Sequence, residues 1–252
     1  MCTLTIAWQV FEEAPVVVAA NRDELTDRPS EPPSVVEGDP AFVAPRDAEA
    51  GGTWVGYNER GVFVGVTNRW VEVAGGGERS RGRLVRDALR AESAAAARET
   101  VEAAVAADTY DGFNLVVADA ADAFLFEWDG TLSTTRLTPG VHVVVNVGAD
   151  GDYFEPARRP EAGREQADNA RRVREALEPR ERSDRESADA WRERAASVLR
   201  DHDYGVCVHD PEGRYGTRSS SLVTLRADGD ADYAFAPGPP CETAYEPVES
   251  QV

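Results

Sequence analysis

Residues 1–24 read MCTLTIAWQVFEEAPVVVAANRDE, and this stretch decides both the expected fold and the candidate site. Apolar residues alternate with others from Leu4 to Val10, which predicts a half-buried strand. Residues 16–20 are continuously apolar, which predicts a strand that is buried on both faces. The four residues between the two strands are few enough for a hairpin loop.

Closing this hairpin brings Cys2 to the polar quartet Asn21, Arg22, Asp23 and Glu24. In antiparallel pairing with these strand ends, paired residue numbers sum to about 25, which places Cys2 opposite Asp23. A slip of one residue would reverse the face that each side chain uses. Because Cys2 would still lie beside the quartet, we expect these residues to form a site.

Cys2 directly follows the initiator methionine. Aminopeptidases remove Met before a residue as small as Cys, which would leave a thiol and a free α-amine on one residue. The thiolate is the nucleophile, and the α-amine, with a pKa of about 7.7–8.0, is a usable base near neutral pH. Such residues perform acyl transfer, and Arg22 would favour a thiolate or a substrate carboxylate. In the alternative interpretation, Cys2 is incidental and the quartet is a polar turn.

The composition is strongly acidic. There are 46 acidic and 27 basic residues, every basic residue is arginine, and the net charge is −19. This predicts a salt-rich cytoplasm and a haloarchaeal host, since high ionic strength screens self-repulsion; a merely acidic protein from a GC-rich genome is the alternative. Nucleic acid and anionic membranes are poor partners for such a surface. Without a stretch near ~20 apolar residues or a signal-peptide pattern, we expect a cytoplasmic protein without membrane insertion.

Strands come in groups and helices in two blocks along the rest of the chain. We expect a hairpin at 50–57 and 61–68, helices at 80–108 (broken near Ser93), 159–177 and 188–201, and strands at 113–118, 123–128, 131–137, 141–147, 205–209, 217–225 and 233–236. Ser183 and Glu186 have capping-box spacing. Residues 28–45 and a tail over about 237–252 are expected to be irregular. The pattern predicts a single α+β domain over residues 1–252.

Four polar residues stand out within or at the ends of these later strands: Asn68, Asn114, Asn146 and Arg218. Buried Asn side chains must find hydrogen bonds, and one or two are candidates to donate to an oxyanion during acyl transfer. A structural role at a strand end is the alternative for each Asn. Arg218 in an otherwise apolar strand requires a carboxylate or phosphate partner.

The cysteines and histidines do not form a recognisable disulfide framework or metal site in the sequence. Cys2, Cys207 and Cys241 are too few and too scattered for a disulfide framework. His202, Cys207 and His209 have a spacing that matches no zinc pattern. We therefore expect no metal, and the α-amine is the better candidate base for Cys2.

Seven segments in order resemble the NRDE family, which includes the transport and Golgi organisation proteins of eukaryotes. They are Met1-Cys2, residues 20–24 with Arg28-Pro29, residues 51–56, Thr67-Asn68, residues 80–85, residues 112–115 and residues 215–220. The resemblance runs from Met1 to about Leu225. It implies a fold like the N-terminal-nucleophile (Ntn) hydrolases, a four-layer αββα sandwich.

Roles for single residues also follow from this resemblance. Cys2 would be nucleophile and base, Arg22 and Asp23 would orient it, Asn146 would donate to an oxyanion, and Arg218 would be a second guanidinium. The chain departs from the family at residues 143–146, where a Gly-Leu-Ser-Asn segment is usual, and at residues 154–158. Both departures leave the role of Asn146 and the substrate contacts open.

Three functions compete. The leading hypothesis is an Ntn-type cysteine amidohydrolase or acyltransferase that acts on a small acylated compound and needs no cofactor. The second is a non-catalytic protein that binds or carries haem, acyl-CoA or lipid, with Cys2 as a soft ligand. The third is a purely structural or interaction protein. Asn21, Glu24, Asn68 and Asn114 are expected to bind substrate or to have a structural role near the site.

Overall fold

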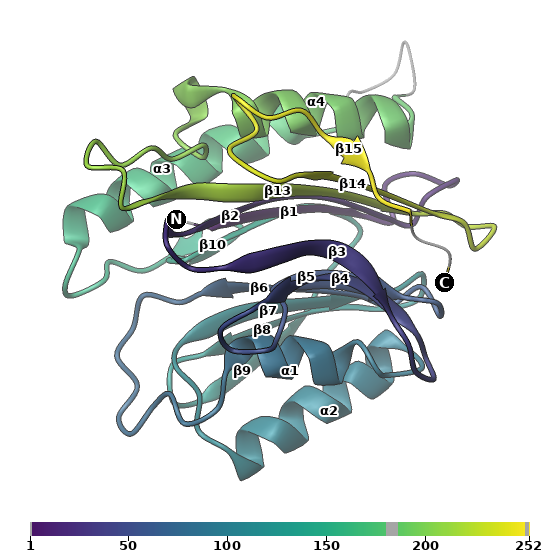
Figure 1. Ribbon diagram of the computed structural model, residues 1–252, viewed down its shortest axis with the longest axis horizontal. Coiled ribbons are helices and arrows are strands. Elements are labelled where there is room, and N and C mark those ends of the chain that lie inside the picture. The colour runs from purple at the N-terminus through teal and green to yellow at the C-terminus, as the bar shows by residue number, and fades with distance from the viewer. Residues whose placement is uncertain (1, 180–185, 250–251) are drawn as a thin grey trace. The chain divides into compact units, whose positions relative to one another are not determined.

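The computed structural model describes residues 2–179, 186–249 and 252. The chain forms two compact units, the first from Met1–Asp27 and Pro139–Val248 and the second centred on Arg28–Thr138. Among the described residues, each unit holds one antiparallel sheet and two α-helices (Figure 1). The predicted α+β class is confirmed, and each unit has the sheet and helix pair that an αββα fold requires.

The first unit contains an eight-stranded sheet with the order β12-β11-β10-β1-β2-β13-β14-β15. Its strands are β1 (Thr3–Trp8), β2 (Val16–Leu25), β10 (Gly140–Val145), β11 (Gly148–Ala149), β12 (Asp152–Tyr153), β13 (Tyr215–Leu225), β14 (Ala231–Ala236) and β15 (Glu246–Pro247). The opening hairpin therefore lies in the middle of the sheet, where its polar ends meet residues from β10 and β13.

Two expectations for this hairpin were wrong in detail. All six residues of β1 are buried, rather than one face only. Thr5 satisfies its buried hydroxyl by donating to Ala19 O (2.8 Å). Thr3 pairs with Asn21, so paired numbers sum to 24 and not 25. The cause is the loop, where Gln9 adopts a positive φ of 53° and its N–H donates to Pro15 O (2.8 Å).

Helices α3 (Pro160–Leu177) and α4 (Ala188–Arg200) lie on one face of this sheet, where α3 contacts β10 and α4 contacts β2 (Figure 1). Trp191 is fully buried and its Nε1–H donates to Leu177 O (2.9 Å), which ties α4 to the end of α3. The predicted capping residue Ser183 lies outside the described residues. Ser187 caps α4 by accepting from Ala190 N–H.

The second unit contains a seven-stranded sheet with the order β3-β4-β5-β6-β7-β8-β9. Its elements are β3 (Ser30–Val36), β4 (Phe42–Asp47), β5 (Val55–Asn58), β6 (Phe63–Asn68), α1 (Arg81–Ala88), α2 (Ala94–Ala107), β7 (Phe113–Ala118), β8 (Ala123–Trp128) and β9 (Leu132–Arg136). Ser80 and Ser93 cap the two helices by accepting from Gly82 and Ala96 N–H. The predicted break near Ser93 is confirmed. Apolar side chains of α1, α2 and the sheet form one buried cluster.

Three segments differ from their predicted structure. Residues 28–45 are not irregular, because they contain β3 and most of β4; the prolines of β3 are tolerated since it is an edge strand, and they lie at its register shift. Residues 205–209 make only an isolated bridge between His209 and Gly216. The tail contains the short strand β15. None of the helices in the described part is long and apolar enough to cross a membrane.

Candidate active site at the N-terminal cysteine

Cys2 lies just before β1, beside the end of β10. The β1–β10 register pairs Thr3 with Val145, so Cys2 meets Asn146. The backbone N–H of Cys2 donates to Asn146 Oδ1 (3.0 Å), and Cys2 is partly buried. If Met1 were removed, this nitrogen would be the α-amine, and Asn146 would already contact it.

Asn146 is held by a second side chain. Its Oδ1 also accepts from Gln166 Nε2 (2.9 Å), and both residues are buried. Gln166 comes from α3, whose buried face is otherwise made mostly of small and apolar residues. Asn146 Oδ1 accepts from both Cys2 and Gln166, so this oxygen positions the Cys2 nitrogen. A hydrogen bond to an oxyanion would have to come from Asn146 Nδ2.

Asp23 is the second polar group beside Cys2. Its carboxylate Oδ1 accepts from Thr217 Oγ1 (2.6 Å), and the Asp23 backbone oxygen accepts from Cys2 Sγ (3.6 Å). Thr217 is itself positioned, since its Oγ1 accepts from Val208 N–H (2.8 Å). The register of β2 and β13, which pairs Asp23 with Thr217, brings these groups together.

Burial controls the protonation of this site. It raises the pKa of the Cys2 thiol, and the Asp23 carboxylate acts in the same direction while Arg22 opposes it. Burial also raises the pKa of the Asp23 carboxyl, against the hydrogen bond from Thr217 and the charge of Arg22. The thiol is therefore protonated at neutral pH, so a nucleophilic Cys2 needs a base.

The other members of the quartet support the site. Arg22 is buried, with Nη2 3.7 Å from Glu24 Oε2. Glu24 also accepts from Leu25 N–H through Oε1 (2.9 Å). Asn21 Nδ2 donates to Leu199 O (3.0 Å) and Val206 O (2.9 Å), which joins β2 to the end of α4 and to the following segment. Asn21 is thus a structural residue in this geometry.

Arg218 is the extra residue of a β-bulge. The β2–β13 register shifts between Thr217 and Ser219, so Arg218 faces no partner residue, and bulges next to active sites commonly redirect a side chain. Arg218 is partly buried, and within residues 2–179, 186–249 and 252 it makes no hydrogen bond or ion pair. A half-buried guanidinium in a chain of net charge −19 is suited to an anionic ligand.

Asn68 and Asn114 belong to the second unit. Asn114 Nδ2 donates to Thr67 Oγ1 (3.1 Å), and its Oδ1 accepts from Arg69 (2.8 Å), which also pairs with Glu127. Asn68 ends β6 and pairs with Phe113. Asn114 therefore serves its own sheet, and a role for either residue at Cys2 stays a prediction.

Sequence reasoning missed Gln166 and Thr217 as site residues. Gln166 had a detectable signal, since it is a polar residue at helical spacing among the buried Gly163, Ala167 and Ala170 of α3. Thr217 lies in the strand that contains Arg218, but threonine is a common β-branched residue in strands, so nothing in the sequence distinguishes it as a site residue.

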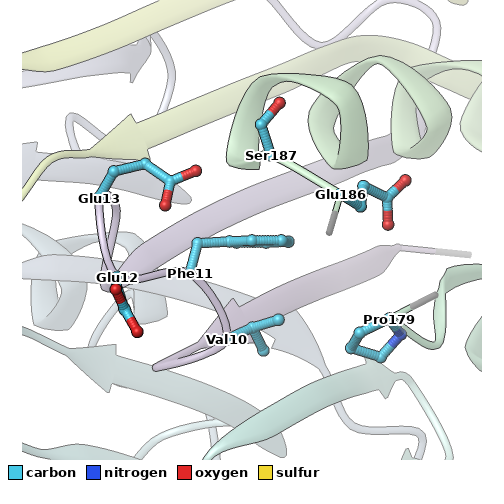
Figure 2. A pocket seen from close by; sticks show the side chains of 7 residues that line it. All are labelled: Val10, Phe11, Glu12, Glu13, Pro179, Glu186 and Ser187. Carbon is cyan, nitrogen blue, oxygen red and sulfur yellow. The ribbon is translucent and has the colours of Figure 1, made fainter. Parts of the chain in front are cut away.

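A cavity of about 310 Å³ lies at the other end of β1 from Cys2. Figure 2 shows its lining, which is Val10, Phe11, Glu12, Glu13, Pro179, Glu186 and Ser187. Two of the carboxylates that line it already have partners. Glu13 accepts from Ala188 N–H at the start of α4 (3.0 Å), and Glu186 forms an ion pair with Arg194. The cavity shares no residue with the Cys2 cluster and is not the candidate site.

Alkylation of Cys2 should depend on pH in a chain that is extended before Met1, which keeps the Cys2 nitrogen as an amide. We expect iodoacetamide to react slowly at neutral pH and faster as pH rises beyond about 8.5, because the raised pKa keeps the thiolate fraction small. Peptide mass spectrometry gives the rate at each pH. The urea-unfolded chain is the control, and faster reaction of the folded than of the unfolded chain at neutral pH would contradict the assignment.

Solved structures of similar fold include proteins named as an acylase, an amidase and a hydrolase. Penicillin V acylase from Agrobacterium tumefaciens matches 94% of this chain and 83% of its own length, at 16% identity and a TM-score of 0.56. A Caenorhabditis elegans orthologue of N-acylethanolamine-hydrolyzing acid amidase matches 88% and 92%, at 13% identity and a TM-score of 0.53. Conjugated bile acid hydrolase from Clostridium perfringens, as a mutant, matches 100% and 97%, at 11% identity and a TM-score of 0.50. The chain has the Ntn-hydrolase type of fold, as predicted.

The family follows from the sequence itself. The chain belongs to the Transport and Golgi organisation 2 family, whose model matches residues 1–234. A Transport and Golgi organization protein 2 homolog from Bos taurus is 25% identical over 232 residues, which cover 85% of this chain and 83% of that protein. The predicted family is confirmed, and neither name specifies an activity.

Proposed function

We propose that this protein is an Ntn-type cysteine amidohydrolase or acyltransferase for a small acylated compound. One observation carries the proposal. The nitrogen of Cys2 contacts Asn146 Oδ1 at 3.0 Å while its thiol lies beside Asp23. Nucleophile, prospective base and an orienting side chain therefore occupy one position, which is the arrangement that acyl transfer by a terminal residue requires.

The reaction begins with removal of Met1, which converts the Cys2 nitrogen into an α-amine. The amine takes the thiol proton, and Sγ attacks the acyl carbon to form a tetrahedral oxyanion. Collapse breaks the C–N bond, and the leaving nitrogen takes the proton from the ammonium group. Water, or a second amine, then attacks the thioester, so that the acyl group leaves Cys2 and the thiol regains a proton.

The neighbouring residues have separate roles in this scheme. Asn146 and Gln166 orient the amine through Asn146 Oδ1. Asp23, held by Thr217, favours the ammonium form that appears when the amine accepts the thiol proton, while Arg22 balances the buried Asp23 charge. Asn146 Nδ2 is the candidate donor to the oxyanion. Arg218 binds an anionic group of the substrate.

Arg218→Ala is expected to raise KM at least about 10-fold for N-acyl amino acids, with kcat nearly unchanged. A hydrogen bond to a charged group contributes about 1.5–3 kcal/mol, and each 1.4 kcal/mol is about tenfold in affinity. Steady-state kinetics on N-acyl amino acids and on their uncharged amides measures the effect. Arg218→Lys should restore part of it, and equal loss on charged and neutral substrates would contradict a carboxylate contact.

Intact mass of the purified native protein tests the activation step. We expect a mass lower than that of the full sequence by one methionine, with Cys2 as the first residue by terminal sequencing. Retention of Met1 in a chain that turns over acylated substrates would remove the α-amine as base. Turnover is best measured in concentrated salt, because the net charge of −19 and the absence of lysine point to a saline cytoplasm.

One observation favours the competing role of a non-catalytic carrier. The raised pKa of Cys2 makes the thiol a poor nucleophile while its nitrogen is an amide. If Met1 stays in place, Cys2, Arg22 and Arg218 would bind haem, acyl-CoA or a lipid without chemistry. Titration with haem and with acyl-CoA separates the roles: saturable binding that is weakened by Cys2→Ala, together with absent turnover, would favour the carrier.

A further inference from the structure

Four side chains that attract metals converge in the first unit, away from the roles assigned above. They are His202, Cys207, His209 and Cys241, and one ligand atom from each lies within 4.8 Å of all the others. Cys207 Sγ is 3.5 Å from Cys241 Sγ. His209 Nε2 is 3.1 Å from Cys241 Sγ and 3.7 Å from Cys207 Sγ.

The distances among His209 Nε2 and the two sulfurs are close to those in a tetrahedral zinc shell. With Zn–S bonds of about 2.3 Å and Zn–N bonds of about 2.0–2.1 Å, two sulfurs lie about 3.8 Å apart and a sulfur and a nitrogen about 3.5 Å apart. The separations between His209 and the two sulfurs fall on either side of this value. His202 is the fourth member, with its ligand atom within 4.8 Å of the other three and its ring centroid 5.2 Å from that of His209. Two thiols and two imidazoles form the Cys2His2 donor set of structural zinc sites.

The fold brings the four ligands together from two segments. His202 begins a 3-10 turn (His202–Tyr204), and the chain then reverses through Gly205 at a φ of 66°. His209 is placed by its bridge to Gly216. Cys241 arrives from the C-terminal segment, 34 positions after Cys207. This separation is why the expectation of no metal, drawn from the spacing of residues 202–209 alone, missed the cluster.

We propose that His202, Cys207, His209 and Cys241 bind one Zn²⁺ ion as a structural site. The ion would join the C-terminal segment to the segment between α4 and β13. Two backbone groups of that segment reach the candidate active site: Val206 O accepts from Asn21, and Val208 N–H donates to Thr217. Zinc would therefore stabilise the segment that positions Thr217, the hydrogen-bond donor to Asp23. The zinc proposal does not depend on whether Cys2 is catalytic.

A disulfide or redox pair explains the cluster less well. All three cysteines are free, and a disulfide needs sulfurs about 2.05 Å apart. Neither a disulfide nor a redox pair accounts for two imidazoles beside the sulfurs, and a metal ion uses all four groups.

Metal analysis of the full-length protein tests the site. Protein purified under reducing conditions without chelator should contain one zinc per chain by plasma mass spectrometry. After removal of the metal, titration with Co²⁺ should produce thiolate charge-transfer absorption and the visible bands of a tetrahedral ion, saturating at one equivalent. Chelation should lower the melting temperature, because zinc binds only the folded arrangement.

Variants show which residues bind. Loss of an outer-shell partner alone weakens metal affinity about 10–100-fold, so Cys241→Ser and His209→Ala should weaken Zn²⁺ binding more than about 100-fold. Cys2→Ser is the matched control, because it removes a thiol outside the cluster, and it should bind Co²⁺ as the parent does. Absence of zinc together with a silent Co²⁺ titration of reduced, folded protein would overturn the proposal. So would a Cys207–Cys241 disulfide in the native protein, or equal loss in the Cys2→Ser control.

Discussion

Replacing Cys2 by serine should abolish turnover of acylated substrates, with a fall of at least about 10³-fold in kcat/KM. Removal of a nucleophile in a comparable catalytic unit costs about 10⁶-fold in kcat. A serine hydroxyl is far less acidic than a thiol and a weaker nucleophile, so the α-amine activates it much less well in a site that holds a thiol. The change is nearly isosteric, and the melting temperature should hardly move, since Cys2 is only partly buried.

The control for this variant is its own fold. Circular dichroism and the melting temperature should match the parent, and removal of Met1 should proceed as before because serine is also small. Residual activity above about a tenth of the parent, in protein shown to be free of parent enzyme, would exclude Cys2 as the nucleophile. A loss of activity that is accompanied by a clearly lower melting temperature would instead show a structural role for Cys2.

Asn21→Ala is expected to lower the free energy of unfolding by about 2–6 kcal/mol. Asn21 is 2% exposed, and its Nδ2 satisfies the backbone oxygens of Leu199 and Val206. The alanine variant leaves both oxygens without this donor, and each buried unsatisfied group costs about 1–3 kcal/mol. Urea denaturation followed by tryptophan fluorescence measures the difference.

The second unit offers a matched control for Asn21. Asn58 is 1% exposed, and its Nδ2 likewise donates to two backbone oxygens near the end of a helix, those of Leu89 and Ala91. Its Oδ1 also accepts from two backbone N–H groups. Asn58→Ala should therefore destabilise at least as strongly. An ordinary substitution lowers the free energy of unfolding by about 1 kcal/mol. A smaller decrease for Asn21→Ala would show that water replaces the amide as hydrogen-bond donor.

Local patterns in the sequence were sufficient for most elements of the fold. Two adjacent apolar runs predicted the central hairpin, and Ser80 and Ser93 marked the helix starts. The register of the hairpin differed by one residue from the prediction because it depends on the conformation of Gln9 in the loop. The spacing of apolar residues carries no information about that conformation. Strand β3 was missed because its prolines read as a loop, and only its place at the sheet edge makes them acceptable.

The candidate site was predictable where its residues are close in sequence or carry a motif. Cys2 lies beside Asp23 as expected, despite the register error. Gln166 and Thr217 act through partners that are far away along the chain, so their roles depend on how α3 and β13 pack. Cys241 shows the same limit, because a ligand contributed from the C-terminal segment leaves no local spacing to detect.

Trapping of the acyl group on Cys2 tests the central claim most directly. The native protein is incubated with an activated acyl ester, quenched in acid, digested and mapped by mass spectrometry. We expect a thioester on a peptide that begins with Cys2, an adduct that hydroxylamine removes, and no adduct in Cys2→Ser. An adduct confined to Cys207 or Cys241, or no adduct on a Cys2 peptide that has lost Met1, would contradict the account.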